Sequence, residues 1–338
     1  MNIKRPAFLI LFLFPMFSSC APRPADCARP DVFCVGLVTA SGSIQSGINQ
    51  QAWLGLQDAQ AEGQADRIDL IETVDPRDRQ ANIQTFINAG YDLIITVGPA
   101  MTNETIFAAK KNPQTRFIGI EQTQDATYPN LTGLVFHEER SGFLAGALAA
   151  SITQTNHVAA LCEAKLLDAM RRYCDGFGAG AQYLNPNVNV DIVYRTGSNQ
   201  NLLNDPDWGN QAALEAVRNG ADVIFAAGGN TATAALETAG EQGAYVIGSE
   251  TDRYADLTDI RSRLASSALN DVRPGVRDLI GRARAGQMPS GNFFGPIRLA
   301  PFHDLDNQIP QAVADQLGQL AQKLSSNPII DDVPYQEP

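Results

Sequence analysis

The sequence contains few of the features by which nucleic-acid-binding proteins and enzymes are recognised. It has 338 residues and a formal net charge of −12, and its lysines and arginines form no cluster, which disfavours a nucleic-acid surface. Its three histidines, His137, His157 and His303, lie far apart in the chain, and no GxSxG, HExxH or P-loop pattern occurs. We therefore expect no enzyme, no cofactor, no metal and no nucleic-acid partner.

Long hydrophobic runs are also absent after the first twenty residues. Lys4 and Arg5 precede an apolar segment, residues 7–17, that is too short to span a bilayer. This charged start, the apolar centre and the two serines that follow are typical of a secretory signal. Cys20 comes next, as in a bacterial lipoprotein signal, where acyl chains on the cysteine give a stable anchor. An ordinary signal peptide with an incidental cysteine is the alternative.

Cysteine is scarce, and the chain has no CxxC pair that would suggest a metal or redox site. Once the lipidated cysteine is set aside, four cysteines remain, an even number in an exported protein. Three pairings are possible. Closeness in sequence favours Cys27–Cys34, which would tie the spacer to the first strand, and Cys162–Cys174, which would tie a strand end to the next helix.

One phrase occurs twice and indicates two similar halves. Residues 88–98 read NAGYDLIITVG and residues 218–228 read RNGADVIFAAG. An apolar run bounded by glycines is typical of a strand buried on both faces in a parallel sheet. A glycine at its carboxyl end allows close approach at the edge where open α/β sheets bind ligands. We expect each half to offer a strand-end loop to a shared cleft, although any two strand–helix units look alike over ten residues.

Strand-like and helix-like segments alternate along the rest of the chain, the pattern of a doubly wound parallel sheet. The expected strands are residues 32–38, 68–73, 92–98, 116–121, 131–136, 157–162, 188–194, 222–227, 244–248 and 261–269. The expected helices are residues 49–62, 77–89, 100–111, 142–152, 168–184, 207–219, 231–242, 274–285 and 310–325.

Two complete halves do not use all of the expected strands and helices, since the last strand and the last two helices are left over. The chain must therefore cross between the halves more than once, and these crossings form a hinge. We predict an α/β fold with two Rossmann-like lobes and parallel sheets, joined by several hinge crossovers. The expected division is 1–19 lipoprotein signal peptide, 20–31 proline-rich spacer, 32–136 with 252–296 lobe 1, 137–251 with 297–330 lobe 2, and 331–338 tail.

The chain resembles the basic membrane protein family of solute-binding lipoproteins, whose better-known members bind purine nucleosides for ABC importers. The matching phrases are IQSGINQQAWLGL at 44–56, GYDLIITVGPAMTN at 90–103, GLVFHEERSGFLAGALAA at 133–150, GFGAGAQYLNP at 176–186, GADVIFAAGG at 220–229, IGSETDRY at 247–254, SSALND at 266–271 and LAPFHDLD at 299–306. The resemblance implies a type I periplasmic-binding fold with three crossovers, a small ligand enclosed between the lobes, a permease partner in the membrane and a monomer.

The resemblance also implies where the ligand contacts lie, and the chain departs from the family there. The expected ligand residues are Asn49, Gln50, Trp53, Gly98, Met101, Asn103, Tyr173, Gly229, Glu250, Asp252 and Asn270. The family aspartate that takes ribose hydroxyls falls on Glu250, and its partner lysine falls on Asn270. The aromatic of the first loop and the acid near position 103 are lost.

Several of these residues also have a plainer interpretation. Trp53 lies at helical spacing with Leu56 and is then part of the core, and Tyr173 packs beside a disulfide. Asn270 is well placed to cap the next helix. For the whole protein, we expect an extracytoplasmic solute-binding lipoprotein that captures a nucleoside or related polar ligand. A ligand-sensing lipoprotein that acts on a membrane receptor is the alternative, and a hydrolase using Glu250 and Asp252 is a weaker one.

Overall fold

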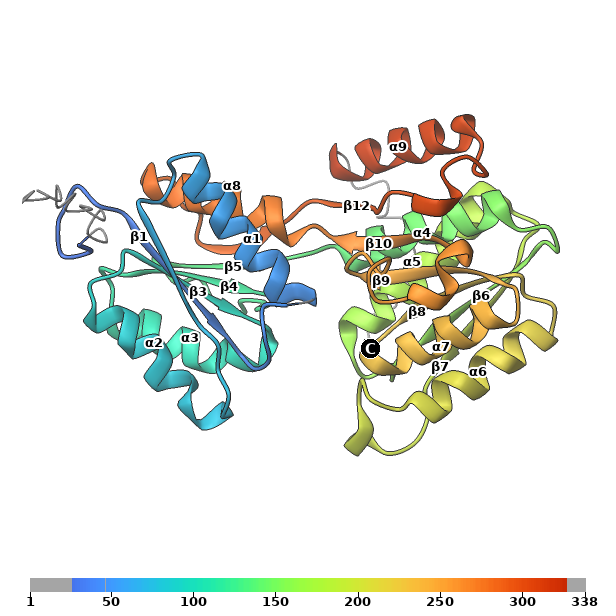
Figure 1. The fold of residues 1–338 in the computed structure, drawn as a ribbon, viewed down its shortest axis with the longest axis horizontal. Coiled ribbons are helices and arrows are strands. Elements are labelled where there is room, and N and C mark those ends of the chain that lie inside the picture. The colour runs from blue at the N-terminus through green and yellow to red at the C-terminus, as the bar shows by residue number, and fades with distance from the viewer. Residues whose placement is uncertain (1–25, 46, 327–338) are drawn as a thin grey trace, which may run out of the picture.

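The structure, a computed structural model, describes residues 26–45 and 47–326. The predicted signal peptide, the lipidated Cys20, the start of the spacer and the tail lie outside these residues. The described chain forms two six-stranded sheets, each flanked by helices, that lie side by side in Figure 1. We call the body around the first sheet lobe 1 and the body around the second sheet lobe 2.

Lobe 1 has the strand order β11-β5-β4-β3-β1-β2, with every pair parallel. Helices α1 and α8 pack on one face of the sheet, and α2 and α3 cover the other. Its strands are β1 (Cys34–Thr39), β2 (Arg67–Ile71), β3 (Leu93–Val97), β4 (Arg116–Ile120), β5 (Leu131–Val135) and β11 (Gly291–Phe294). Its helices are α1 (Gly47–Ala61), α2 (Arg79–Asn88), α3 (Thr102–Lys111) and α8 (Val272–Arg284).

Lobe 2 has the order β12-β10-β9-β8-β6-β7, parallel except for the β10–β12 pair. Helices α4 and α5 cover one face, α6 and α7 the other, and α9 packs on α4. Its strands are β6 (His157–Cys162), β7 (Asn189–Tyr194), β8 (Val223–Ala227), β9 (Tyr245–Glu250), β10 (Leu264–Asn270) and β12 (Ile297–Leu299). Its helices are α4 (Glu138–Ile152), α5 (Asp168–Leu184), α6 (Pro206–Arg218), α7 (Gly229–Glu241) and α9 (Gln311–Ser326).

The repeated phrase folds as predicted. It forms β3 and β8, which are fully buried. The two strands take the same place in their sheets, since β3 pairs directly with β4 and β8 pairs directly with β9. Both strands end at glycines with left-handed backbone, Gly98 at φ 93° and Gly228 at φ 126°. Other side chains rarely adopt such angles, so glycine is required where each strand turns into the loop at its carboxyl end.

Three connections join the lobes, and one of them lies where the sequence did not place it. The chain crosses after β5, after β10 and between β11 and β12. We expected residues 252–296 in lobe 1, but β10 within that range pairs with β9 and β12 in lobe 2. The repeat explains the difference, because β10 follows β9 as β5 follows β4 and completes the second sheet in the same way.

The glycine-rich stretches of α4 and α5 have a packing role that the sequence only partly indicated. A Cβ added at Gly146 would lie 1.9 Å from the carbonyl oxygen of Phe177, and one at Gly180 would lie 2.0 Å from that of Phe143. Two helices can approach this closely only when side chains are absent at the contact. Each glycine therefore packs directly against the backbone of the other helix. The contact fixes α5, which carries residues of the site described below, against α4.

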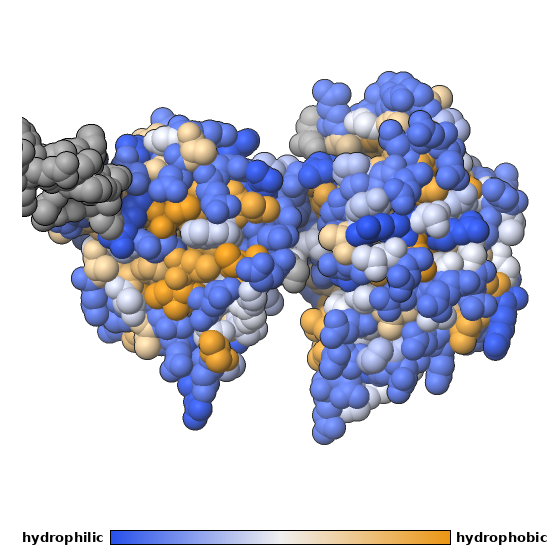
Figure 2. All heavy atoms as spheres, viewed as in Figure 1, coloured by the Kyte–Doolittle hydropathy of each residue, from blue (hydrophilic) through white to orange (hydrophobic). Residues whose placement is uncertain are grey.

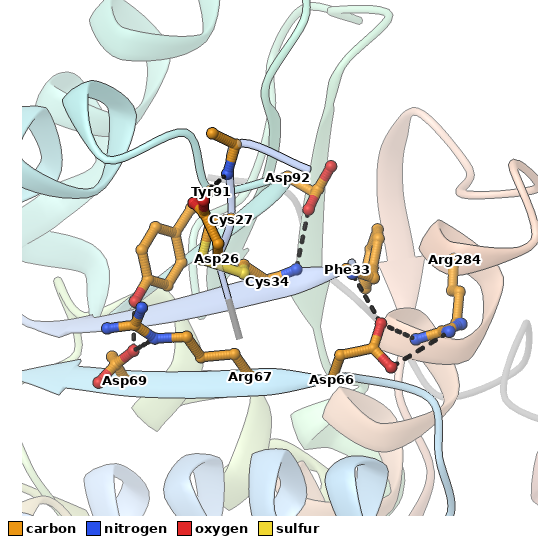
Figure 3. The surroundings of a disulfide bond; sticks show 11 residues. Asp26, Cys27, Phe33, Cys34, Asp66, Arg67, Asp69, Tyr91, Asp92 and Arg284 are labelled. Carbon is orange, nitrogen blue, oxygen red and sulfur yellow. Dashed lines mark hydrogen bonds and ion pairs between the residues drawn. A yellow bond between two sulfur atoms is a disulfide. The ribbon is translucent and has the colours of Figure 1, made fainter. Parts of the chain in front are cut away.

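Both expected disulfides are formed, Cys27–Cys34 and Cys162–Cys174. Figure 3 shows the first, at the start of β1, where the backbone N–H of Cys34 donates to Asp92 at 2.8 Å. Nearby, Asp66 accepts from the backbone N–H of Phe33 and pairs with Arg284 of α8. The segment before β1 is thereby fastened to the sheet, and α8 is fastened to the start of β2.

Candidate functional site

A cavity of about 320 Å³ lies between the lobes. Figure 2 shows the surface there hollowed into a groove that separates the two bodies. Lobe 1 contributes the segment after β3, the segment after β4 and the end of β5; lobe 2 contributes the starts of α4 and α5, the loop before α6 and the ends of β9 and β10. The lining residues are Pro99, Glu121, Thr123, Val135, Phe136, Glu138, Leu167, Asp168, Ala169, Met170, Arg172, Tyr173, Leu203, Glu250 and Asn270.

Two of the cavity's carboxyl groups hold equivalent positions in the two lobes. Glu121 directly follows β4, and Glu250 is the last residue of β9. Strands β4 and β9 are each flanked by the strands that correspond to one another, β3 and β5 in one sheet and β8 and β10 in the other. Both residues have left-handed backbone, with φ 57° at Glu121 and φ 69° at Glu250. Residues other than glycine rarely adopt this conformation, and functional sites are among the places where it recurs.

A third carboxyl group is paired with the cavity's arginine. The Oε2 atom of Glu138, at the start of α4, lies 3.0 Å from an Nη atom of Arg172 on α5. Because α4 and α5 are held in close contact by their glycines, this pair is fixed in the wall of the cavity. The start of α4 also carries positive helix-dipole charge, which favours a carboxylate there.

Tyr173 lines the cavity and also belongs to the hydrophobic core. Its side chain is fully buried beside Cys174, and its ring packs near that of Phe225, with 6.2 Å between ring centroids. Its hydroxyl forms no hydrogen bond with the described residues. A buried hydroxyl without a partner is costly, so this group is available to a ligand that enters the cavity.

Burial dominates the electrostatics of the site. Desolvation raises the pKa of Glu121 to about 8, with a further contribution from the charges of Glu250 and Glu138. Desolvation likewise raises the pKa of Glu138 to about 7 despite the opposing charge of Arg172. It also raises the pKa of Glu250, which the charge of Arg253 opposes. The carboxyl groups therefore hold protons more strongly than carboxyl groups in water do. A cationic ligand, or one with many hydrogen-bond donors, would offset the free-energy cost of ionising them.

Three of the ligand residues predicted from the sequence lie in the cavity wall: Tyr173, Glu250 and Asn270. Asn270 is buried, and its Oδ1 lies 3.5 Å from Oγ of Ser141. It does not cap α8, which corrects that alternative, because the residue at the N-cap position is Asp271 and no side-chain hydrogen bond caps the helix.

The other eight predicted residues do not line this cavity, and a ligand role for them stays a prediction. Those residues are Asn49, Gln50, Trp53, Gly98, Met101, Asn103, Gly229 and Asp252. The side chains of Asn49 and Gln50, in the first turn of α1, donate to backbone carbonyls of the loop before that helix, and Met101 is fully buried in lobe 1. Asp252 lies 2.8 Å from Nε2 of His303, so the structure does not bring it into the cavity as a partner of Glu250 for hydrolysis.

Sequence reasoning missed Glu121, Glu138, Arg172 and Phe136. Glu121 had a usable signal, because it ends its strand as Glu250 does and the repeat relates the two strands. The pairing of Glu138 with Arg172 had none, since it depends on how α4 and α5 pack. In the part of the chain that the structure describes, no group of three or more His, Cys, Asp or Glu side chains is placed to hold a metal ion.

Comparison with known proteins agrees with this geometry. A family model described as "ABC transporter substrate-binding protein PnrA-like" matches residues 33–293. The chain is 29% identical over 280 residues to the CD4+ T-cell-stimulating antigen of Listeria monocytogenes serovar 1/2a, covering 77% of this chain and 76% of that protein. It is 25% identical over 281 residues to the ABC transporter nucleoside-binding protein BmpA of Lactococcus lactis subsp. cremoris, covering 78% of each.

Two solved structures share the fold. A transcriptional activator of the comK gene from Bacillus halodurans superimposes with a TM-score of 0.72 at 22% identity, covering 86% of this chain and 96% of that one. An ABC transporter solute-binding protein from Conexibacter woesei gives 0.69 at 20% identity, covering 87% and 97%. The predicted type I periplasmic-binding fold is confirmed. The family match spans most of the chain, and the protein therefore belongs to the PnrA-like, basic membrane protein family of ABC transporter substrate-binding proteins.

Proposed function

We propose that this protein captures a nucleoside or a closely related polar solute between its lobes, outside the cytoplasm, and presents it to an ABC permease. The observation that carries the proposal is the cavity itself, which takes polar side chains from equivalent strand ends of both lobes. Its volume of about 320 Å³ is in the range of small-molecule sites.

The chemistry of the wall suits a nucleoside-like ligand. Glu250 can accept charge-assisted hydrogen bonds from a vicinal diol, as the resemblance implied, and such bonds are among the stronger ones. Phe136 and Tyr173 belong to the wall, but both rings are fully buried, so they shape the cavity and its apolar side rather than present a free face. The relative from Lactococcus lactis carries nucleoside binding in its name, which favours the same ligand class here.

Capture would proceed by closure of the hinge, without catalysis. The three connections between the lobes are short, and the chain between β5 and α4 amounts to two residues, Phe136 and His137. A ligand that contacts both lobes binds the closed arrangement more tightly and shifts the open–closed equilibrium toward it. A permease would recognise the closed form, while acyl chains on Cys20 would hold the protein, as a monomer, at the membrane.

The test begins with protein purified without refolding. Native mass spectrometry would identify any solute that copurifies, and a thermal-shift screen of nucleosides, bases and sugars would rank ligands. We expect a nucleoside to raise the melting temperature, Glu250→Ala to abolish that shift, and Glu237→Ala, an exposed acid of α7, to leave it unchanged. A sugar that shifts the wild type while no nucleoside does would contradict the ligand class.

A further inference from the structure

The cavity holds two carboxyl groups with no partner of their own. Among the described residues, the side chains of Glu121 and Glu250 form no hydrogen bond and no ion pair. Every other charged side chain in the wall has one: Glu138 pairs with Arg172, and Asp168 accepts from Arg171 at 2.8 Å. When Glu121 and Glu250 ionise, the cavity therefore carries negative charge that no side chain of the wall balances, one residue of each lobe contributing to it.

Arginines near the cavity do not supply the missing charge. Arg172 is held by Glu138. Arg253, which lowers the cost of ionising Glu250, donates instead to Oγ1 of Thr233 at 2.6 Å and lies 3.4 Å from Asp256. The family lysine position beside the ribose-binding acid is occupied by the neutral Asn270. A carboxylate without a counter-charge is costly away from water, so these groups keep their protons in the empty cavity, and a cation entering it would let them ionise.

Independent signs of a ligand lie at the same place. Tyr173 is fully buried and forms part of the cavity wall, and within the described ranges 26–45 and 47–326 its hydroxyl has no hydrogen-bond partner. Glu121 and Glu250 both keep a strained left-handed backbone, which is retained where the surroundings or a function require it. Three polar groups without partners thus converge on one space that is large enough for a small molecule.

We infer that the ligand carries a cationic nitrogen group and that this group, in place of the ribose hydroxyls considered above for Glu250, is bound between Glu121 of lobe 1 and Glu250 of lobe 2. The inference rests on the proposed function and narrows its ligand class, from nucleoside-like solutes in general to those with a positively charged amine, amidine or alkylated ring nitrogen. Tyr173 lines the same cavity, and its hydroxyl proton is available for a hydrogen bond to a carboxyl group or to the ligand.

The position of the two acids also gives the cation a role in closure. When the cavity holds no cation, the two carboxyl groups cannot both ionise as the lobes approach, because each charge opposes the other and both lose water, so closure without a ligand costs either repulsion or proton uptake. A cation between them converts repulsion into two attractions, one for each lobe. Its binding energy is therefore larger in the closed arrangement, which is the condition for a ligand to drive closure.

A matched pair of nucleosides tests the inference. 1-Methyladenosine carries a positive charge on its base at neutral pH, adenosine does not, and adenosine 5′-monophosphate adds negative charge. We expect calorimetric titration to show 1-methyladenosine bound at least about tenfold more tightly than adenosine, and the monophosphate bound most weakly. Glu121→Gln and Glu250→Gln keep the shape of the side chain and remove its capacity to ionise when a cation binds. Each should reduce the preference for the cation by roughly tenfold, and Glu237→Gln is the matched surface control.

The outcomes separate the inference from the function it rests on. Tighter binding of adenosine, or an unchanged cation preference in both glutamine variants, would overturn the inference and leave nucleoside capture standing. Binding of none of the three compounds by the wild type would contradict both. Melting curves add a check without ligand, since each glutamine variant should melt at or above the wild-type temperature at about pH 8 if the acids serve binding rather than folding. A lower melting temperature in both would overturn the inference.

Discussion

Glu163 and Arg195 form an ion pair in the interior of lobe 2, where both side chains are almost completely withdrawn from solvent. The Nε of Arg195 donates to Oε1 of Glu163, and Oε2 accepts from the backbone N–H of Leu203 at 2.9 Å and from the hydroxyl of Thr231 at 2.7 Å. Burial alone would raise the pKa of Glu163, but these hydrogen bonds outweigh it and hold the pKa below its usual value. Glu163 thereby fixes the loop that brings Leu203 into the cavity wall.

Replacing Glu163 by alanine should destabilise the protein strongly. The substitution leaves the Arg195 guanidinium buried with only Asp205 and a backbone carbonyl as partners, and breaking a buried pair in this way costs about 3–5 kcal/mol. Urea unfolding measures the change. Asp278→Ala removes half of the exposed ion pair with Arg282 and should cost less than about 1 kcal/mol, so equal losses in the two variants would contradict the role given to Glu163.

The contact between α4 and α5 should tolerate no side chain. In Gly146→Ala the new methyl group meets the carbonyl oxygen of Phe177, a backbone atom that cannot rotate away. We expect a loss of about 1–3 kcal/mol or more in the free energy of unfolding. Ligand binding should also weaken, because a shift of α5 displaces Arg172 and Tyr173, which belong to that helix and line the cavity. Gly318→Ala, on α9 with open space around it, should be neutral or stabilising by up to about 1 kcal/mol. A tolerated alanine at position 146 would show that the helices lie farther apart.

The second disulfide should matter for both stability and binding. Cys162 ends β6 and Cys174 follows Tyr173, so the bond fastens the tyrosine's helix to the sheet. The double variant Cys162→Ser, Cys174→Ser should lose about 2–3 kcal/mol of stability, the range for a loop of this length, and bind its solute less tightly. Thermal unfolding and titration of the variant against the wild type, both oxidised, measure the two effects. An unchanged affinity at equal folded fraction would separate the disulfide from the site.

Stability should depend on pH through the cavity acids, with a sign opposite to that of ordinary paired carboxylates. The pKa of Glu121 rises from 4.5 to about 8 on folding because burial, and then the charges of Glu250 and Glu138, oppose ionisation. The folded protein thus keeps a proton that the unfolded chain releases, and the free energy of unfolding falls as pH rises from about 4.5 to about 8. Glu138, which faces Arg172, Glu139 and Glu250, also has a raised pKa, of about 7. It therefore also lowers the free energy of unfolding as pH rises from about 4.5 to about 7.

Glu121→Gln should remove its share of that dependence. Urea unfolding at several pH values should show the variant losing less stability than the wild type between about pH 5 and 8, with the difference reaching a few kcal/mol at most. The two proteins should agree most closely near about pH 4.5, where the wild-type glutamate is protonated in the folded state. Parallel pH curves would show that Glu121 is ionised in the fold at neutral pH.

The sequence predicted the lobes well because their signals are local and repeated. The phrase at 88–98 and its copy at 218–228 predicted two equivalent buried strands, and β3 and β8 take equivalent places in their sheets. The helix predicted at 168–184 has the bounds of α5. The lobe assignment of β10 was wrong, because a strand's pattern predicts that it is buried but does not indicate which sheet it joins.

The site was harder to predict because it depends on contacts between distant segments. The rule that strand ends face ligands identified Glu250, and the same rule applied to the end of β4 would have identified Glu121. Glu138 and Arg172 are 34 positions apart and meet only because glycines let two helices approach closely. Met101 was expected at the ligand as part of the set that the family resemblance implied, yet its side chain is fully buried in the core of lobe 1.

Small-angle X-ray scattering of the protein with and without its solute tests the central claim most directly. If a small molecule is held between Glu121 and Glu250, saturation should reduce the radius of gyration in the wild type, and Glu250→Ala should scatter alike with and without the solute. A radius of gyration that stays constant while titration shows full occupancy would contradict capture by closure of the two lobes.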